Sequence, residues 1–476
     1  MKTPSASLTP LFLFAFSLAH SSAAGAEETA VTTNAHDPGV RAGSIGAGPA
    51  LASLSGPQQD FFEDGLERFV EVDSVDGSQP DAEGHGLGPG YNATGCGACH
   101  SQPAAGGTSP RADTYPFVGP NPQVAAASIY GATNAVPSFV TLDGPVLETR
   151  FPFVVDAQGH LTSTRDGGVH AIYTIAGRVD APGCTLAQPN YDQMLQLGNL
   201  VFRIPTPVFG AGLIENIADA TILANMNANG SLKRALGIGG HPNTSGNDGS
   251  IARFGWKAQN KSLEIFSGEA YNVEMGVSNE LFPNERANPP ANCMYNATPE
   301  DHTNFEEAGA GVTSDTVGFT VFMRFLAAPL PSTAGIPGNP SQASITRGRQ
   351  YFSAIHCDLC HTPTLQTAAS NFTQGLDHQN ANLYSDLLVH NMGGGLADNV
   401  VQGAANGKEF RTAPLWGVGQ RIFFLHDGRA RPANGGLMTA IQAHSSAGSE
   451  ANAVIWTFNH IDDSKKQDIL NFLRSL

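Results

Sequence analysis

The chain has 476 residues, 25 of them lysine or arginine and 42 aspartate or glutamate, so its formal net charge is −17. Hydrophobic residues make up 41% of it, too many for an intrinsically disordered chain. The acidic balance argues against nucleic acid as a partner, because phosphate binding needs a basic surface patch. The 54 glycines and 31 prolines, with few charges, predict long ordered loops and disfavour a coiled coil, a repeat array or a membrane transporter.

The first 26 residues have the pattern of a secretory signal peptide. Lys2 precedes an apolar run from Leu8 to Ala19, and small residues follow at Ala24-Gly25-Ala26. The run is too short to span a bilayer; an N-terminal anchor or a disordered tail is the alternative. We therefore expect a periplasmic or secreted protein with no membrane span after signal removal. Residues 27–57, rich in small and hydroxyl residues, predict a flexible leader.

A predicted short helix at Phe61–Phe69 precedes the first cysteine motif. Residues 96–100 read Cys96-Gly97-Ala98-Cys99-His100, a C-x-x-C-H sequence. This spacing is typical of c-type haem attachment, in which two thiols bind the porphyrin vinyl groups and the histidine ligates the iron. The motif and the signal peptide support each other, because such attachment takes place outside the cytoplasm.

The middle of the chain predicts irregular structure. Apolar and polar residues alternate in places between 145 and 210, which favours short strands. Cys184 and Cys293 can pair in an oxidising compartment or remain two free thiols; the sequence leaves both open. Residues 331–344, rich in proline and glycine, predict a linker.

A second helix and a second motif follow the linker. Residues 345–352 predict a helix, residues 357–361 read Cys357-Asp358-Leu359-Cys360-His361, and residues 462–476 predict a terminal helix that packs on this unit. A zinc site is the first alternative, but zinc needs two cysteine pairs close together. A redox dithiol is the second, and it needs a βαβ context that is not seen. Two covalently bound haem c groups are therefore the expected cofactors.

These elements predict a mainly α fold with long loops and a few short strands, built on two cytochrome c-like haem domains. We expect an N-terminal catalytic haem domain with inserts at 58–330 and a C-terminal electron-transfer domain at 345–476.

Several segments resemble the di-haem oxidoreductase family, whose members are sometimes described as peroxidases. The resemblance covers roughly residues 60–476 and is carried by residues 86–92, 209–215, 253–258, 383–393, 409–417 and 425–430. That family is distantly similar to bacterial di-haem cytochrome c peroxidases, to the di-haem enzyme that matures a tryptophan-derived quinone and to di-haem rubber oxygenases. The resemblance implies a catalytic N-terminal haem open to a small oxidant and a C-terminal haem that transfers electrons.

The resemblance places a second ligand of the C-terminal iron near residues 440–444. His444 is the preferred candidate, giving His361/His444 coordination as in the rubber oxygenases; bis-histidine ligation leaves no open position. The alternatives are Met438, Met392, His390 and His426.

The N-terminal iron has no obvious second ligand. Residues 101–130 contain no histidine or methionine, which favours a five-coordinate or water-bound iron. A distant His160 or His170 is the alternative.

The resemblance also assigns two residues between and above the haems. Trp256 matches an electron relay between them, and Glu274 matches a carboxylate that moves protons during peroxide cleavage. Phe266 stands where the peroxidases have glutamine, which makes the pocket more apolar. The alternative for Trp256 is an ordinary core aromatic residue, and the alternative for Glu274 is a solvated surface acid.

Arg411, Arg429 and Arg253 are candidate partners of the haem propionates, with surface cations as the alternative. Related peroxidases hold calcium between their domains, but no ligand loop for calcium is evident here.

Three functions remain open. The first is a peroxidase-like oxidoreductase that passes electrons between the haems to reduce peroxide or oxidise a substrate. The others are an electron carrier without catalysis and a dioxygen-dependent oxygenase. The expected partner is a small redox donor protein or a small-molecule substrate.

Overall fold

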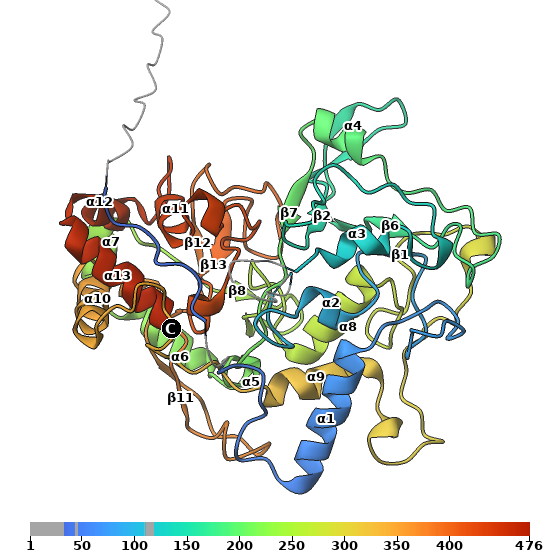
Figure 1. The fold of residues 1–476 in the computed structure, drawn as a ribbon, viewed down its shortest axis with the longest axis horizontal. Coiled ribbons are helices and arrows are strands. Elements are labelled where there is room, and N and C mark those ends of the chain that lie inside the picture. The colour runs from blue at the N-terminus through green and yellow to red at the C-terminus, as the bar shows by residue number, and fades with distance from the viewer. Residues whose placement is uncertain (1–32, 43–45, 109, 111–118) are drawn as a thin grey trace, which may run out of the picture. The chain divides into compact units, whose positions relative to one another are not determined.

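The computed structural model describes residues 33–42, 46–108, 110 and 119–476 (Figure 1). Residues 35–476 form one unit that holds both cysteine motifs. The predicted signal peptide, residues 1–26, lies outside the described residues. None of the described helices has the length and apolar character needed to cross a membrane.

Helices dominate, as the sequence predicts, and most of them are short. Those before residue 330 are α1 (Gly56–Val70), α2 (Cys96–Cys99), α3 (Pro122–Ala126), α4 (Tyr191–Gln196), α5 (Ala211–Glu215), α6 (Asp219–Asn227), α7 (Gly230–Leu236), α8 (Leu263–Glu274) and α9 (Asp315–Phe325). The later ones are α10 (Gln342–Ala354), α11 (Leu437–Gln442), α12 (Asn452–His460) and α13 (Asp463–Ser475). Short 3₁₀ turns are η1 (Ile129–Gly131), η2 (Ala291–Cys293), η3 (Gly309–Val312), η4 (Cys357–Leu359), η5 (Val418–Gln420) and η6 (Pro432–Asn434). Helices α1, α10 and α13 confirm the three helices expected from the sequence.

The strands are two to five residues long, and many lie in the predicted region. One three-stranded antiparallel sheet has the order β5 (Val169–His170), β2 (Glu148–Arg150), β7 (Val201–Arg203). The other strands form antiparallel pairs: β1 (Gly90–Tyr91) with β6 (Tyr173–Thr174), β3 (Phe153–Val155) with β4 (Leu161–Arg165), β8 (Asn243–Thr244) with β9 (Ile251–Ala252), β10 (Leu365–Gln366) with β11 (Asn380–Ala381), and β12 (Val389–Asn391) with β13 (Glu409–Arg411). The register of the three-stranded sheet sets Glu148 opposite Arg203.

Two helix crossings repeat the same arrangement. In α1, a Cβ atom at Gly65 would lie 2.4 Å from the Gly318 carbonyl oxygen of α9. In α10, a Cβ atom at Gly348 would lie 1.9 Å from the Asp468 carbonyl oxygen of α13. Glycine therefore lets each helix pair approach closely, and the two pairs lie in different parts of the molecule (Figure 1).

A phenylalanine follows each of these glycines by four residues, on the same helix face. The Phe69 ring centre lies 5.8 Å from that of His100, and the Phe352 ring centre lies 6.2 Å from that of His361. Each crossing thus sets an aromatic ring beside the histidine of one cysteine motif.

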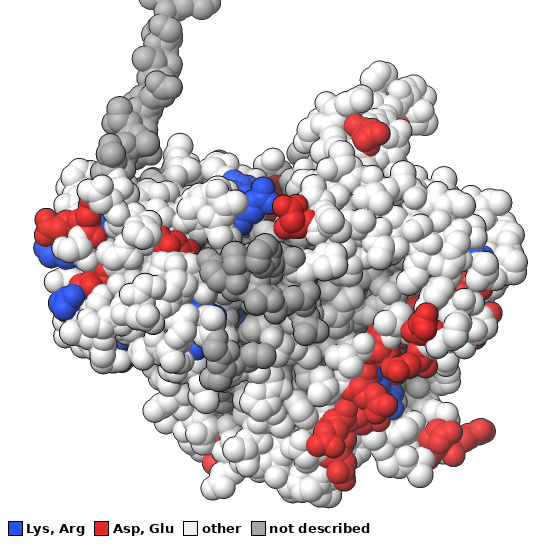
Figure 2. All heavy atoms as spheres, viewed as in Figure 1, with Lys and Arg blue, Asp and Glu red and all other residues white. Residues whose placement is uncertain are grey.

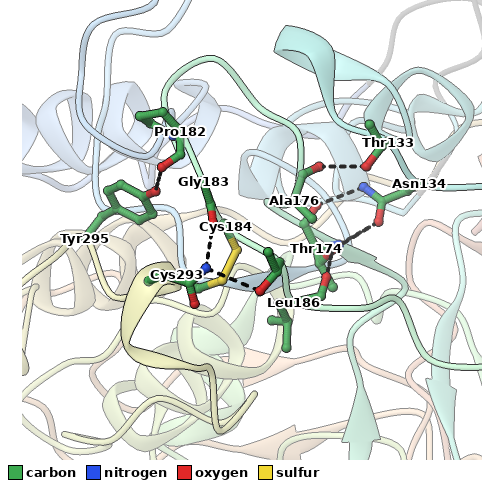
Figure 3. Close-up of a disulfide and its surroundings, with 12 residues drawn as sticks. Thr133, Asn134, Thr174, Ala176, Pro182, Gly183, Cys184, Leu186, Cys293 and Tyr295 are labelled. Carbon is green, nitrogen blue, oxygen red and sulfur yellow. Dashed lines mark hydrogen bonds between the residues drawn. A yellow bond between two sulfur atoms is a disulfide. The ribbon is translucent and has the colours of Figure 1, made fainter.

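The structure pairs Cys184 with Cys293, one of the two possibilities left open by the sequence. Figure 3 shows the bond joining the loop after β6 to η2, with the Tyr295 hydroxyl donating to the Pro182 carbonyl oxygen at 2.6 Å. None of the four motif cysteines takes part in a disulfide.

The described end of the predicted flexible leader, residues 35–42 and 46–57, packs against the rest of the unit. The Arg41 amide donates to the Gly419 carbonyl oxygen at 2.8 Å, and Arg474 Nε donates to Asp37 Oδ1 at 2.7 Å. A buried ion pair and backbone hydrogen bonds therefore order this stretch, which its composition did not indicate.

Candidate functional site

The first cysteine motif lines a cavity of about 130 Å³. Cys96 and Cys99 lie on α2, and His100 follows directly. The ring Nδ1 of His100 donates to the Gly107 carbonyl oxygen at 2.9 Å, which leaves Nε2 free. Burial lowers the pKa of His100 to about 4, so the ring is neutral at physiological pH. A neutral imidazole with one nitrogen fixed by a carbonyl is the form that ligates metals.

The second motif lines a larger cavity of about 220 Å³ that holds two such histidines. His361 Nδ1 donates to the Tyr384 carbonyl oxygen at 3.0 Å, and His444 Nδ1 donates to the Ala440 carbonyl oxygen at 2.7 Å. Burial lowers the pKa of both rings, that of His361 to about 4.

The ring centres of His361 and His444 are 6.4 Å apart. Two imidazoles on opposite sides of one metal ion, each with a metal–nitrogen bond of about 2 Å, have ring centres roughly 6 Å apart. The spacing of this pair fits one iron held between them.

The alternative ligands of the second iron are less suited. Both ring nitrogens of His390 are engaged, Nε2 with Asp386 at 3.0 Å and Nδ1 with Glu450 at 2.7 Å. His426 lines the cavity, but its ring stacks on Phe410 with ring centres 4.3 Å apart. Met392 also lines the cavity; Met438 is not part of the lining.

Two buried arginines in the second cavity test whether a haem fits it. Arg411 Nη1 and the Nε and Nη2 atoms of Arg421 are buried and find no hydrogen-bond partner within the described chain. Burial lowers the pKa of each guanidinium to about 10, and at Arg411 the charge of Asp386 offsets only part of this effect. A haem carries two propionates, the anions that such donors require. The residues present therefore fit the group.

The other two predicted propionate partners lie elsewhere. Arg429 is exposed and pairs with Asp427, and Arg253 pairs with Asp219; neither is among the described residues that line the two cavities. Arg421 was missed because it lies in an irregular segment and matches no local motif.

Trp256 lines both cavities. It is 9% exposed, and its Nε1 donates to the Ile204 carbonyl oxygen at 2.8 Å. Its ring lies edge-on to His426, with ring centres 6.4 Å apart. The structure thus sets one aromatic ring between the two cysteine motifs.

Glu274, the last residue of α8, lies buried in the first cavity rather than on the surface. Its Oε2 accepts from Asn92 Nδ2 at 2.7 Å. Burial and then the charge of Glu148 raise the pKa of Glu274 to about 8. The side chain is therefore a carboxylic acid at neutral pH, able to donate a proton into the cavity.

The first cavity holds further polar groups that sequence reasoning missed. Gln259 lines it with a buried Oε1 that has no partner in the described chain, and Arg203 lines it with an unpartnered Nε. Phe266 also lines it and stacks on Phe254. The cavity is mostly apolar but keeps an amide close to the expected acid.

The predicted alternatives for a second ligand at the first iron lie outside this cavity. His170 pairs with Asp166 at 3.0 Å and stacks on Phe151, and His160 is exposed. Among the described residues that line the first cavity, His100 is the one histidine.

Comparison with protein families identifies the family of the chain. Residues 165–476, more than half of the chain, match the family described as "Di-haem oxidoreductase, putative peroxidase". The chain belongs to this family. Haem is therefore the cofactor of this di-haem oxidoreductase, and the chain is an enzyme, as the sequence predicts. The matched region contains Trp256, Glu274 and the second motif; the first motif lies before it.

Likeness to solved structures is remote. The hydrazine synthase of Kuenenia stuttgartiensis matches at 16% identity over 34% of this chain and 55% of that chain, with a TM-score of 0.21. A MauG-like protein associated with microbial copper homeostasis matches at 17% identity over 57% of this chain and 90% of that chain, with a TM-score of 0.28. The chain thus spans about half the length of the hydrazine synthase chain. No curated protein matches it.

Proposed function

We propose that this di-haem oxidoreductase is an exported c-type enzyme that reduces peroxide at the first cavity with electrons delivered through the second. The observation that carries the proposal is the asymmetry of the two cavities around Trp256. One is lined by a facing pair of histidines, and the other combines a single histidine with a buried acid.

The two cysteine motifs are the proposed attachment points. Cys96 and Cys99 would bind one haem with His100 on its iron, and Cys357 and Cys360 would bind the other between His361 and His444. The repeated crossings at Gly65 and Gly348 support two cytochrome c-like units within the chain. Bound haem would supply a redox-active iron to each cavity; His361 and His444 would both hold the second, and His100 would hold the first.

The chain's own residues then handle protons and electron passage. Reduction of hydrogen peroxide to two waters consumes two electrons and two protons. Glu274 donates a proton into the first cavity and recovers it from solvent. Trp256 bridges the two cavities as the electron relay, and a small redox protein is the proposed donor.

A dioxygen-dependent oxygenase is the second candidate, because Phe266 and the mostly apolar lining of the first cavity would suit an organic substrate. A pure electron carrier needs a second ligand at the first iron. The described lining offers no second histidine but includes Met275 and Met323, so the spin state of this iron decides between the two functions.

Electron paramagnetic resonance of the ferric protein, before and after addition of hydrogen peroxide, tests the function. One high-spin and one low-spin signal are expected, with the high-spin signal lost on peroxide addition. Two low-spin signals indifferent to peroxide would reject a peroxidase and favour the electron carrier. Dioxygen consumption with an organic substrate, but no peroxide turnover, would favour the oxygenase.

The relay has its own test. Trp256→Phe removes the indole and its hydrogen bond to Ile204 but keeps an aromatic ring, so both haem spectra should persist. Peroxide turnover should fall by about tenfold or more. Rapid-mixing absorption spectroscopy would show slower electron loss from the second haem; an unchanged rate excludes the relay role.

Export is supported by residues 1–26 alone. N-terminal sequencing of the mature protein should place the new terminus just after Ala26.

A further inference from the structure

A second carboxylate faces Glu274 in the first cavity. Glu148, the first residue of β2, and Glu274, at the end of α8, both line the cavity, and Glu274 donates a hydrogen bond to Glu148. Two carboxyl groups in contact in a buried site cannot both be ionised without large cost, so the pair shares one proton.

The surroundings decide which member of the pair is ionised. Arg150, two residues along β2 and therefore on the same face, donates from Nε to Glu148 Oε1. Arg203 lies opposite Glu148 in the sheet register and adds a second positive charge. Burial alone would raise the pKa of Glu148, but the charges of the two arginines outweigh it and lower the pKa.

The orientation of Glu274 is fixed from its other side. The Asn92 amide is 1% exposed; its Oδ1 accepts from the Ile172 amide at 2.7 Å, and its Nδ2 donates to Glu274 Oε2 at 2.7 Å. Because Oε2 accepts this hydrogen bond, the carbonyl role falls to Oε2 and the structure favours Oε1 as the oxygen that carries the acidic proton. The remaining charged groups that face the pair are Arg286 and Glu269, the second of which also lines the cavity.

We propose that Glu148 is a positioning residue that holds Glu274 as a neutral carboxylic acid with its proton directed within the first cavity. Glu274 then begins each turnover as the proton donor. Once it has donated, its carboxylate lies beside that of Glu148, and the repulsion between them drives uptake of a proton from solvent. That Glu274 donates its proton to peroxide rests on the proposed function. That Glu148 and Glu274 share one proton does not depend on it.

Infrared difference spectroscopy of the ferric holoprotein tests the pair without any turnover. The stretching band of a protonated carboxyl group should titrate with a midpoint near pH 8 and should be absent in Glu274→Gln. In Glu148→Gln the proton affinity of Glu274 should fall about tenfold or more, because the neighbouring negative charge is gone.

Arg150→Gln provides a second test, in which the midpoint should shift in the opposite direction. It also serves if Glu148→Gln does not fold. Loss of this cation leaves the negative charge of the pair less compensated, so the midpoint should move to higher pH. Glu269→Gln, at the same cavity, is the comparison variant and should move the midpoint less than Glu148→Gln, because Glu269 Oε2 accepts a hydrogen bond from Asn260. Haem absorption spectra of each variant report whether the site is intact.

The outcomes separate the inference from the function. A midpoint unchanged in Glu148→Gln or Arg150→Gln, or a band that survives Glu274→Gln, overturns the inference even if the enzyme reduces peroxide. Opposite shifts in the two variants support it even if the enzyme reduces no peroxide, in which case only the proposed function fails.

Discussion

At the scale of single residues, His444 is the side chain that distinguishes the two cavities. It faces His361 across 6.4 Å, whereas His100 has no facing histidine among the described residues of its cavity. In the proposed assignment, an iron held by both histidines would have no open position, so this one residue would determine where a small oxidant can bind.

His444→Ala should therefore convert the second iron from low spin to high spin. The matched control is His426→Ala, because His426 lines the same cavity but stacks on Phe410. Electron paramagnetic resonance of the ferric proteins should show the low-spin signal lost in the first variant and retained in the second. The reverse pattern would make His426 the ligand.

Residues near the motifs were predictable and residues brought in from a distance were not. The proposed ligands His100 and His361 follow from a five-residue pattern, while the proposed roles of Trp256, Glu274 and His444 required a family resemblance. Glu148 and Arg421 carry no local signal. Glu148 reaches the cavity only through the register of β2 with β7, and Arg421 only through the fold of an irregular segment.

At the scale of elements, the crossing of α10 and α13 depends on the absence of a side chain at Gly348. Glycine to alanine in a helix interior usually stabilises a protein by roughly 0.5–1 kcal/mol. Here a Cβ atom would lie 1.9 Å from the Asp468 carbonyl oxygen, and backbone cannot move aside without separating the helices.

Gly348→Ala should therefore lower the free energy of unfolding by about 1–3 kcal/mol, the usual cost of overpacking. Gly56→Ala is the matched control, since a Cβ atom at this first residue of α1 would meet nothing within 4 Å. Urea unfolding followed by circular dichroism measures the free energy of unfolding of both variants. Equal stability of Gly348→Ala and the unchanged protein would show that the crossing can relax.

The disulfide between Cys184 and Cys293 closes a long loop of the chain, which contains β7 and α4 to α8. It links residues 109 positions apart in the sequence. Closing a loop of this length restricts the unfolded chain by about 3–5 kcal/mol. In urea unfolding, the free energy of unfolding of the double variant Cys184→Ser/Cys293→Ser should be lower by that amount. A reductant should lower the stability of the unchanged protein but not that of the variant. If a reductant destabilises both proteins equally, reduction of the Cys184–Cys293 disulfide is not the cause of the loss of stability.

The helices were easier to predict than the strands because helix signals are local. Helix α1 begins at a Ser55 capping box with Pro57 in its first turn, and α10 begins where the Ser341 side chain accepts from the Ser344 amide. Strands of two or three residues leave no periodicity to read, so the alternation between 145 and 210 indicated their presence but not their pairing.

At the scale of the whole molecule, the excess of acidic residues is unevenly distributed. Acidic side chains gather over α1 and its neighbours (Figure 2). Asp73, three residues after the end of α1, is only 2% exposed. Its Oδ1 has no hydrogen-bond partner in the described chain. The Tyr271 hydroxyl lies 3.4 Å from its Oδ2 and 3.0 Å from Asp315 Oδ2.

Burial, and then the charges of Glu71, Asp315 and Glu300, raise the pKa of Asp73 well above its ordinary value. The cations of this region already have carboxylate partners: Arg68 pairs with Asp64 and Asp315, and His85 pairs with Glu300. The folded protein therefore keeps a proton on Asp73 that the unfolded chain releases above its ordinary pKa of 3.8. More protons bound in the folded state mean that stability falls as pH rises.

Asp73→Asn should remove this dependence, because the amide matches the size of the neutral acid and does not titrate. Above about pH 5, the free energy of unfolding of the unchanged protein should fall relative to the variant, by up to about 1.4 kcal/mol for each pH unit until the folded-state pKa is passed. Urea unfolding of both proteins at a series of pH values measures the difference, in which the contributions of all other groups cancel. Parallel stability curves would mean that Asp73 is ionised in the folded protein and that its charge is balanced by a group other than a proton.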